Sequence, residues 1–323
     1  MHLNLLIACC DIENLLLVSS GTAALQVAAK ALDVRKAITT PFSFAATTSA
    51  LDWIGVEMEF ADIDSDTLNL CPRHVADALD ASDGKVSGIV ATHVYGNPCD
   101  IDSFESLAYK NDVAMIYDAC HAFGVNFGDR SILQFGDAST LSFHATKVFH
   151  TVEGGAIAFR DETALSEARA LINFGIDQSG SLGYQGTNAK LSEYQCAVGL
   201  AVVENIDNIL ERRRELFQIY TNRLSDHFDL PKWHSDASTN GAYMPIILDS
   251  SAAVDSTIDL LDKRGVQSRR YFFPGLNNAY SQHRSHGCSN SDSVAGRVLC
   301  LPMHSYLSNA EVDYVIDTLI GGI

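Results

Sequence analysis

The stretch LLLVSSGTAALQVAAKALDVRKAITTP, residues 15–41, contains the pattern that decides the fold: two β-rich runs, LLLVSS and KAITTP, on either side of a helical one at residues 22–32. Two parallel strands need a crossover connection between them, and this connection is usually a helix. The alternation continues to about residue 160, with strand candidates VEMEFADI, VSGIVATHV, VAMIYDA, ASTLSFHA and GAIAFRD and helix candidates at residues 45–54, 72–81 and 101–111. The sequence therefore predicts an α/β fold with a mostly parallel central sheet and helices on both of its faces.

The remainder of the chain has a different pattern. From residue 192 apolar residues recur at steps of three and four through a long helical stretch, and Arg212, Arg213 and Arg214 are interpreted as the solvated face of that helix. Beyond residue 230 come strand candidates AYMPIILD and VLCLP and a closing helix at residues 309–320. We therefore expect a large domain over residues 1–205 and a smaller α+β domain over residues 206–323, which includes the linking helix.

Charge and composition restrict the classes of partner. The chain has 323 residues, is 47% hydrophobic, and carries 22 basic against 40 acidic side chains, for a formal net charge of -18. This charge repels nucleic acid and anionic membranes. We therefore expect neither as a partner, and an anionic ligand has to be held by local hydrogen-bond donors.

The cysteines and the first residues favour a reduced, cytoplasmic protein. The eight cysteines form no CxxC pair, and Cys9 and Cys10 are interpreted as core residues. They close the apolar run LNLLIACC, which has no preceding Lys or Arg and is interrupted by Asp11 and Glu13, so we expect no signal peptide. HRSHGC, at residues 283–288, superficially resembles a metal cluster but lies in a Ser/Asn/Gly-rich run, and no metal is expected there.

Functional residues are expected where strands end, because ligands of open parallel sheets bind beyond the carboxyl ends of the strands. Directly after LLLVSS comes GTAAL, residues 21–25, a turn into the predicted helix. A helix N-terminus offers free N–H groups to an anion, and the hydroxyl of Ser20 or Thr22 could add another donor. The same SSGT sequence is equally a good N-cap.

Asp118 ends the apolar run VAMIYD, which is typical of a buried central strand. Its carboxylate either caps the following turn or pairs with a cation at the strand end. His121 follows three residues later, on the side where a turn would bring it to Asp118.

Lys147 occupies the same topological place after ASTLSFHAT. A lysine in a strand-terminal pocket loses hydration, which lowers its pKa and frees the amine to attack carbonyls. The alternative is an exposed loop lysine, but Ser142, His144, His150 and Glu153 lie close to Lys147 in the chain, and two glycines follow Glu153.

A phosphate-binding helix start, a buried acid and a lysine together match the requirements of pyridoxal 5'-phosphate. The helix start suits its phosphate, the acid its ring nitrogen, and the lysine its aldehyde. No one of the three features is specific alone.

The chain resembles the sugar aminotransferases of the DegT/DnrJ/EryC1/StrS family, which have the fold type I aminotransferase architecture. The resemblance covers nearly the whole chain from Leu15 onward. It is carried, in this order, by SSGTAAL, TPFSFAATTSA, FADIDSDTLNL, HVYGNPCDID, YDACHAFG, SFHATKVFHTVEGGA, GTNAKLSEYQCAVGL and LCLPMH.

The resemblance implies roles for residues around the cofactor ring. Lys147 would bond the cofactor aldehyde and, once released, move a proton between cofactor and substrate carbons. Asp118 would pair with the ring nitrogen, and His121 would bond the ring hydroxyl or its neighbourhood. Phe44 would stack on the ring, although composition alone would place it in the core.

The resemblance also implies how the phosphate is held. Gly21, Thr22 and Ala23, together with Ser142, would bind it. Asn188 would be contributed by the partner subunit, so the active site would require a homodimer.

The substrate is implied by the same resemblance. A lysine at position 147 favours transamination over the dehydration catalysed by family members that carry a histidine there. HATK followed by an acid and two glycines is found in members that aminate C4 of nucleotide-linked 4-keto-6-deoxy sugars, with dTDP the expected nucleotide and glutamate the donor, in deoxysugar pathways such as those of lipopolysaccharide O-antigen. Members acting at C3 more often carry a proline-glycine-lysine box. The candidates for substrate contacts, each of which could instead be a surface or packing residue, are His150, Glu153, Lys190, Arg269, Arg270 and Tyr271.

Two alternatives remain open on the sequence alone. Family members usually have several dozen residues before SGTAAL, whereas 19 precede Ser20 here, so a truncated cofactor-binding homologue without turnover is one of them. The other is a metal hydrolase that uses His93, His121, His144 and His150, which the lack of an HExxH motif disfavours.

Overall fold

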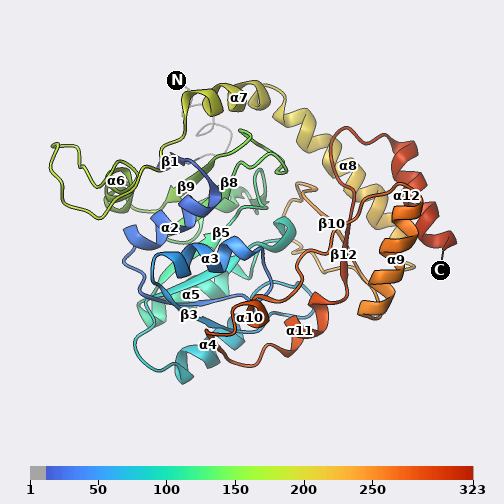
Figure 1. Ribbon diagram of the computed structural model, residues 1–323, viewed down its shortest axis with the longest axis horizontal. Coiled ribbons are helices and arrows are strands. Elements are labelled where there is room, and N and C mark those ends of the chain that lie inside the picture. Colours follow the sequence, from blue (N-terminus) through green and yellow to red (C-terminus); the bar gives the residue numbers. More distant parts are fainter. Residues whose placement is uncertain (1–11, 323) are drawn as a thin grey trace.

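A central eight-stranded sheet dominates the computed structural model, which describes residues 12–322 (Figure 1). In spatial order its strands are β1 (Leu15–Val18), β9 (Gly155–Phe159), β8 (Ala138–Ser142), β5 (Ala114–Asp118), β4 (Gly88–Thr92), β2 (Lys36–Thr39), β3 (Glu57–Phe60) and β11 (Arg284–Ser285). Strand β9 is antiparallel to both of its neighbours, and the other pairs are parallel. The predicted mostly parallel sheet is confirmed.

Helices cover both faces of this sheet, as predicted. The first core cluster joins one face to α4 (Pro72–Ala81), α5 (Ile101–Asn111) and the start of α8 (Ile206–Leu224). The second joins the opposite face to α2 (Gly21–Ala31), α3 (Ala45–Trp53) and α6 (Glu162–Leu171). Strand β4, GIVAT, is buried along its whole length because both of its faces are covered.

A second, smaller group of elements packs around an antiparallel pair, β10 (Met244–Ile247) and β12 (Val298–Leu301). Its core cluster is built from α8, α9 (Ser251–Lys263) and α12 (Asn309–Gly321). The two strands and the closing helix match the prediction. Shorter elements complete the structure: the 3₁₀ turns at Val94–Gly96 and Ile132–Gln134, the hairpin β6 (Asn126–Phe127) and β7 (Arg130–Ser131), and α10 (Leu276–Ala279) and α11 (Ser289–Ala295).

The long helical stretch after residue 192 is divided in two, contrary to the expectation of one helix. Helix α7 (Glu193–Val203) ends before Asn205, and α8 begins at Ile206. Asn205 has φ -119° and ψ 14°, outside the helical region. Asparagine is a weak helix former, because its side chain competes for backbone hydrogen bonds, so a break there is physically reasonable.

The interpretation of the three arginines of α8 as a solvated face is wrong for Arg213, while Arg212 is half-buried and Arg214 is exposed as predicted. Arg213 is buried, and its guanidinium donates to the carbonyls of Gly241 and Met303 at 2.9 and 3.2 Å. Arg212 donates to the carbonyl of Leu307, and Arg214 to that of Thr239. Three consecutive arginines in a sequence do not indicate these hydrogen bonds, because the carbonyls that accept them lie in distant loops.

Some sequence-based expectations fall outside the described residues, namely those for the apolar run at residues 3–10 with Cys9 and Cys10. Within residues 12–322, no helix is both long and apolar enough to cross a membrane. The cysteines in this range carry free thiols.

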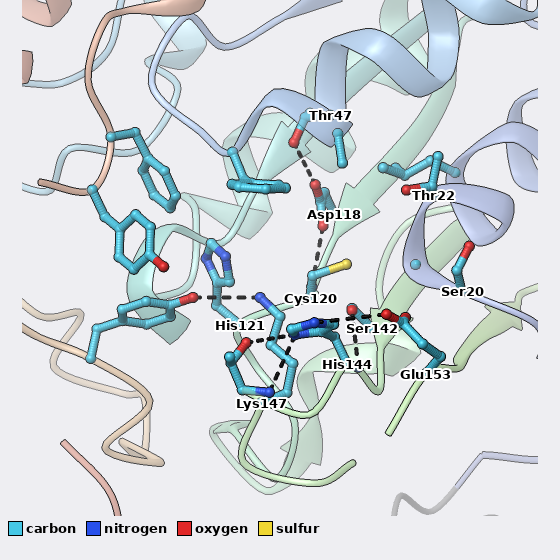
Figure 2. Close-up of a pocket in the computed structure, with 18 residues that line it drawn as sticks. Ser20, Thr22, Thr47, Asp118, Cys120, His121, Ser142, His144, Lys147 and Glu153 are labelled. Atoms are coloured by element: carbon cyan, nitrogen blue, oxygen red, sulfur yellow. Dashed lines mark hydrogen bonds and ion pairs between the residues drawn. The ribbon is translucent and has the colours of Figure 1, made fainter. Parts of the chain in front are cut away.

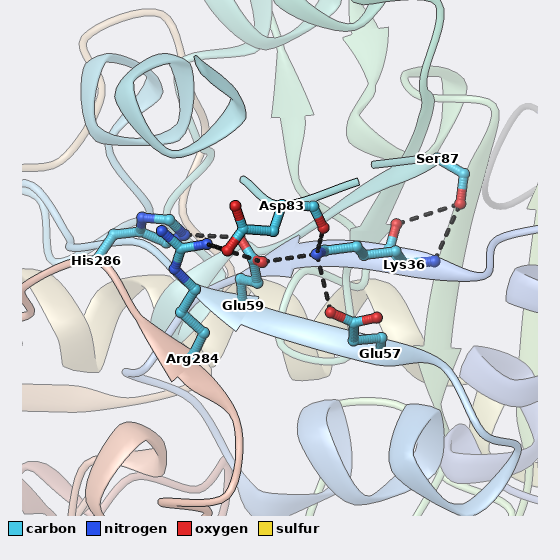
Figure 3. A network of polar contacts seen from close by, with 7 residues as sticks. All are labelled: Lys36, Glu57, Glu59, Asp83, Ser87, Arg284 and His286. Carbon is cyan, nitrogen blue, oxygen red and sulfur yellow. Dashed lines mark hydrogen bonds and ion pairs between the residues drawn. The ribbon is translucent and has the colours of Figure 1, made fainter. Parts of the chain in front are cut away.

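Strand β11 belongs to the segment HRSHGC, in the range expected for the smaller domain. It nevertheless pairs with β3 and forms an edge of the large sheet. The contact is made by an ion-pair cluster around Glu59, which we call the β11 clasp (Figure 3). Buried Glu59 accepts from Lys36 Nζ at 2.8 Å and from His286 Nε2 at 2.7 Å. Arg284 Nη1 reaches Asp83 at 2.8 Å. Arg284 and His286 of HRSHGC thus have structural partners.

Neutralising Glu59 is expected to destabilise the fold. Among the described residues, Glu59→Gln leaves the buried ammonium of Lys36 with the exposed Glu57 as its one carboxylate partner, and we expect a loss of about 2–4 kcal/mol in the free energy of unfolding. Glu57→Gln is the matched control and is expected to cost less than about 1 kcal/mol. Urea unfolding of the three proteins measures both values, and equal effects of the two substitutions would contradict the clasp.

The difference in the free energy of unfolding between wild type and Glu59→Gln should depend on pH, because Glu59 titrates. Burial by itself raises the pKa of Glu59, but hydrogen bonds from Lys36 and His286 outweigh burial and hold the pKa below the ordinary value of 4.5. The clasp therefore contributes stability above pH 4.5 that is lost as pH falls through the depressed pKa. The difference between wild type and Glu59→Gln should shrink over that acid range.

Candidate active site

A cavity of about 340 Å³ lies beyond the carboxyl ends of β5 and β8, at the start of α2 (Figure 2). It gathers most of the residues predicted from sequence. Those that line it are Gly21, Thr22, Phe44, Asp118, His121, Ser142, Lys147, Glu153 and Tyr271.

One end of the cavity is built by the start of helix α2. The Ser20 side chain caps the helix by accepting from the N–H of Ala23 at 3.1 Å. The N-cap interpretation of SSGT is confirmed, and the N–H groups of Gly21 and Thr22 have no protein acceptor among the described residues. Together with the helix dipole, these groups could bind an anion, and the anion site stays a prediction. Ala23 itself does not line the cavity.

Gly21 allows α2 to approach β8 closely. An added Cβ would lie 2.7 Å from Cβ of Ser142, a distance that side-chain atoms do not tolerate. Gly21→Ala must therefore push the helix start away from Ser142 and separate the two predicted phosphate-binding groups.

The expected result of Gly21→Ala is about a tenfold or greater loss of affinity for inorganic phosphate and for phosphorylated ligands of this cavity, because overpacking costs ~1–3 kcal/mol. Isothermal titration calorimetry measures the affinity. Gly321→Ala is the control, since an added Cβ there meets nothing within 4 Å. If Gly21→Ala leaves the affinity for phosphate unchanged, the start of α2 is not part of the phosphate site.

Asp118 ends β5 and is 4% exposed, with its carboxylate at the cavity. Its Oδ2 accepts from Thr47 Oγ1 at 2.7 Å, and its Oδ1 accepts from the N–H of Cys120 at 3.2 Å. Both of the alternatives considered for this residue therefore receive support: it stabilises the turn that follows β5, and it faces the crevice. A buried carboxylate with no lysine or arginine ion-pair partner among the described residues is suited to a positively charged group of a ligand.

His121 lies beside Asp118 as a neutral ring. Burial, with further repulsion from Lys147 and His93, lowers the pKa of His121 well below its ordinary value. Its Nδ1 is buried and has no hydrogen-bond partner within the described part of the chain. His121 lines the cavity, where its neutral ring can hydrogen-bond a ligand oxygen. Phe44 also lines the cavity, is 56% exposed and is not a core residue.

Lys147 projects into the cavity from a turn that follows β8, in which its N–H donates to the carbonyl of His144 at 2.9 Å. Its Nζ donates to Tyr243 Oη at 3.4 Å and lies 5.9 Å from the centre of that ring. The amine makes no ion pair with any described carboxylate, so it is available for chemistry. The exposed loop lysine considered as an alternative is therefore not what the fold produces.

The wall opposite α2 comes from the C-terminal part of the chain. Phe272 stacks on His121 with ring centroids 5.6 Å apart, and Tyr243 contacts His121 edge-on. The buried Tyr95 hydroxyl donates to the carbonyl of Tyr271 and fixes this segment against the large sheet. Sequence reasoning missed Tyr243 and Phe272, since neither stands in a motif near Lys147.

Other predicted residues lie outside the cavity. Asn188 and Lys190 lie on the segment between α6 and α7, where Lys190 Nζ donates to Asn173 at 3.1 Å. His150 is half-buried with an unpartnered Nδ1, and Arg270 pairs with Asp255 at 2.8 Å. Arg269 lines a second cavity of about 540 Å³. That cavity adjoins the first, because Thr146, Tyr243 and Tyr271 line both.

Two of the four histidines named for a metal site, His93 and His144, make other contacts. His93 is stacked on Tyr117 and accepts from the N–H of Cys99 at 3.0 Å, and burial lowers its pKa to about 3. His144 Nδ1 contacts Thr146, and its Nε2 lies 3.7 Å from Glu153. Within residues 12–322, no three His, Cys, Asp or Glu side chains form a group that could hold a metal ion.

The cavity fits pyridoxal 5'-phosphate. Free N–H groups at α2 suit the phosphate, the carboxylate of Asp118 suits a protonated ring nitrogen, and the unpaired amine of Lys147 suits the aldehyde. When bound, this cofactor supplies an electron-withdrawing ring for reactions at the α-carbon of an amine. A fold of this architecture with these three groups is that of a pyridoxal-phosphate-dependent aminotransferase.

Comparison with known proteins places the chain within that class. The model of the DegT/DnrJ/EryC1/StrS aminotransferase family matches residues 6–320, and the chain belongs to this family. It is 36% identical to a dTDP-4-amino-4,6-dideoxy-D-glucose transaminase of Shigella dysenteriae, over 95% of this chain and 85% of that protein. A transaminase with the same name from Escherichia coli is 32% identical, over 96% and 86%.

Solved structures agree. DesI, determined in the presence of its TDP-sugar product, has a TM-score of 0.90 and 32% identity over 97% of this chain and 81% of its own. A family member from Brucella abortus has a TM-score of 0.93 at 24% identity, over 98% and 88%, which supports the fold. The expected fold type I architecture and the dependence on pyridoxal 5'-phosphate are confirmed.

Proposed function

We propose that this protein transfers an amino group from glutamate to C4 of a dTDP-linked 4-keto-6-deoxyhexose, giving a dTDP-4-amino-4,6-dideoxy sugar. The observation that carries the proposal is the cavity that gathers Lys147, Asp118 and the start of α2. The activity of the two relatives of 36% and 32% identity supports the choice of sugar and nucleotide. In this proposal the pathway is one of deoxysugar synthesis, for which lipopolysaccharide O-antigen and a cytoplasmic location remain predictions.

The residues of the chain have separate roles in this proposal. Lys147 would hold the cofactor at its aldehyde and would carry a proton to and from the reacting carbons, and its Nζ donates to Tyr243 Oη at 3.4 Å. Asp118 would hold the protonated ring nitrogen, Phe44 would pack on the ring, and His121 would hydrogen-bond the ring oxygen. The start of α2 with Ser142 would hold the phosphate.

The second cavity supports a substrate that carries a bulky, charged group in addition to the ketohexose. A ketohexose alone would not need an adjoining space of about 540 Å³. Arg269 lines this space and has no carboxylate partner among the described side chains. We assign this cavity to part of the nucleotide diphosphate, with Arg269 facing the negative charge, while Glu153 and Tyr271 face the sugar in the first cavity.

A panel of ketosugars tests the proposal. Purified enzyme with pyridoxal 5'-phosphate and glutamate is incubated with the dTDP-linked 4-keto-6-deoxy sugar, with its 3-keto isomer, and with the GDP- and UDP-linked 4-keto sugars. Mass spectrometry should find an amine only, or at least about tenfold faster, with the dTDP-linked 4-keto sugar. Preference for the 3-keto isomer would convert the account into that of a C3 aminotransferase, and no turnover on any member would favour a cofactor-binding homologue.

We further propose that two copies of the chain share their active sites. The segment between α6 and α7 projects from the large sheet (Figure 1) and exposes apolar side chains, with Phe174 53% and Leu182 76% exposed. Asn188 lies in this segment and does not reach the cavity of its own chain. A second copy that covers this segment would bring Asn188 to the partner's phosphate site. The division at about residue 205 into a large and a smaller domain likewise remains our proposal.

Complementation tests the shared site. Lys147→Ala and Asn188→Ala are both expected to reduce activity in their homodimers. A mixed dimer, purified through two different tags, regains one intact site, so we expect about half of the wild-type activity per dimer. A mixed dimer no more active than the mean of its parents, or an active monomer, would contradict the proposal.

A further inference from the structure

Three hydroxyl groups form a buried chain of hydrogen bonds that ends on Asp118. Thr92 Oγ1 donates to Ser43 Oγ at 3.1 Å, Ser43 lies 2.8 Å from Thr47 Oγ1, and Thr47 Oγ1 donates to Asp118 Oδ2 at 2.7 Å. Thr92, Ser43 and Thr47, which we call the hydroxyl chain, are each at most 2% exposed. Figure 2 shows the last link, between Thr47 and Asp118.

The direction of each hydrogen bond in the hydroxyl chain follows from the number of protons. Each hydroxyl has a single hydrogen to donate. The carboxylate of Asp118 can only accept hydrogen bonds, so the hydroxyl of Thr47 must donate its hydrogen to this carboxylate. Ser43 must then donate to Thr47, and Thr92 to Ser43. All three donors therefore point toward Asp118, and each bond polarises the next one.

The positions of these residues in the fold explain why the hydroxyl chain is rigid. Thr92 ends β4 and Asp118 ends the neighbouring β5, while Ser43 lies in the connection from β2 to α3 and Thr47 in the first turn of α3. The hydroxyl chain therefore links Asp118 to the end of β4 and to the start of α3. Its Oδ1 is held independently by the N–H of Cys120. Both carboxylate oxygens have fixed partners, so the plane of the carboxylate cannot rotate freely.

We propose that the hydroxyl chain is a positioning device, in which Ser43 and Thr92 act through Thr47 to aim the carboxylate of Asp118 at the cofactor ring. This inference rests on the proposed role of Asp118. Ser43 and Thr92 do not line the cavity, so they influence the cofactor only through this chain. Thr47 lines the cavity and makes the direct contact.

The test measures the affinity of the apo protein for pyridoxal 5'-phosphate, by absorbance titration, rather than turnover. We expect Thr47→Val to weaken binding about tenfold and Ser43→Ala about threefold, because a hydrogen bond to a charged group contributes more than one to a neutral group. Thr47→Ser keeps the hydroxyl and should retain wild-type affinity to within about twofold.

Two matched controls separate this effect from a loss of packing. Thr48 is the next residue of α3, fully buried, and its hydroxyl has no partner among the described residues, so Thr48→Val removes a hydroxyl of equal burial that is not part of the chain. Ser139 is 1% exposed and donates to the carbonyl of Phe135, so Ser139→Ala matches Ser43→Ala. Affinity losses in these controls equal to those of Thr47→Val and Ser43→Ala would overturn the proposal.

A double-mutant cycle with Asp118→Asn decides the mechanism. If the hydroxyl chain acts through Asp118, Thr47→Val and Ser43→Ala should lose their effect on affinity, to less than about twofold, in the Asp118→Asn background. Unchanged effects in that background would overturn the hydroxyl chain and leave the role of Asp118 intact. If Asp118→Asn alone does not weaken binding, the role of Asp118 fails, and the inference fails with it.

Discussion

Lys147→Ala should abolish amino transfer, with a fall in kcat/KM of at least about 10³-fold, since the substitution removes both the nucleophile and the group that carries the proton. The structure gives the reason. Lys147 is the one lysine that lines the cavity within residues 12–322, and its amine makes no ion pair there. No other described amine is in position to replace it.

The measurement is turnover of glutamate and ketosugar, together with the mass of the protein after borohydride reduction, which fixes the cofactor covalently wherever a lysine carries it. Wild type should gain the mass of the reduced cofactor, and Lys147→Ala should not. Lys110→Ala, an exposed lysine of α5, is the control and should behave as wild type. Retention of more than about a tenth of wild-type activity by Lys147→Ala would contradict covalent catalysis at this residue, since acid–base roles alone contribute ~10²-fold or more.

Asp118→Asn is expected to have the second largest effect, a fall in turnover of about 10²–10³-fold, because stabilisation of charge in a buried site contributes ~3–4 kcal/mol to the barrier. Asparagine keeps the shape of the side chain and can still accept from Thr47 through its amide oxygen. What it loses is the hydrogen bond from the N–H of Cys120 and the negative charge that would face the protonated ring nitrogen. The protein should therefore fold normally and turn over slowly.

Asp137→Asn is the matched control for this substitution. Asp137 precedes β8, does not line the cavity, and accepts from the N–H of Met115 at 2.8 Å. Its replacement is expected to lower stability without changing kcat by more than about twofold, since it touches none of the groups around Lys147. Equal losses of kcat in the two variants would show that the charge of Asp118 has no specific role.

The parts of the fold that could be predicted from sequence are those determined locally. Short apolar runs alternating with helical patterns indicate parallel strands, and Asp118, Lys147 and Gly21 follow such runs directly. The carboxyl ends of parallel strands meet at one edge of a sheet, so the order of strands and helices along the chain is enough to predict that these three residues lie close together.

The parts that could not be predicted depend on contacts between distant segments. Tyr243 reaches Lys147 across 96 positions of the chain, and the three arginines of α8 bond carbonyls 25 to 95 positions away. Strand β11 has two residues, too few for any periodicity to register. The hydroxyl chain is likewise hidden, since serine and threonine in SFAATT are compatible with an ordinary helix start.

The central claim is that the site built around Lys147 moves nitrogen from glutamate to C4 of a dTDP-linked sugar. The most direct measurement uses ¹⁵N-labelled glutamate with the dTDP-linked 4-keto-6-deoxy sugar, followed by NMR of the product. We expect ¹⁵N coupled to the proton on C4 with wild type and none with Lys147→Ala. Label on C3, or an unlabelled sugar recovered while glutamate is unchanged, would contradict the account.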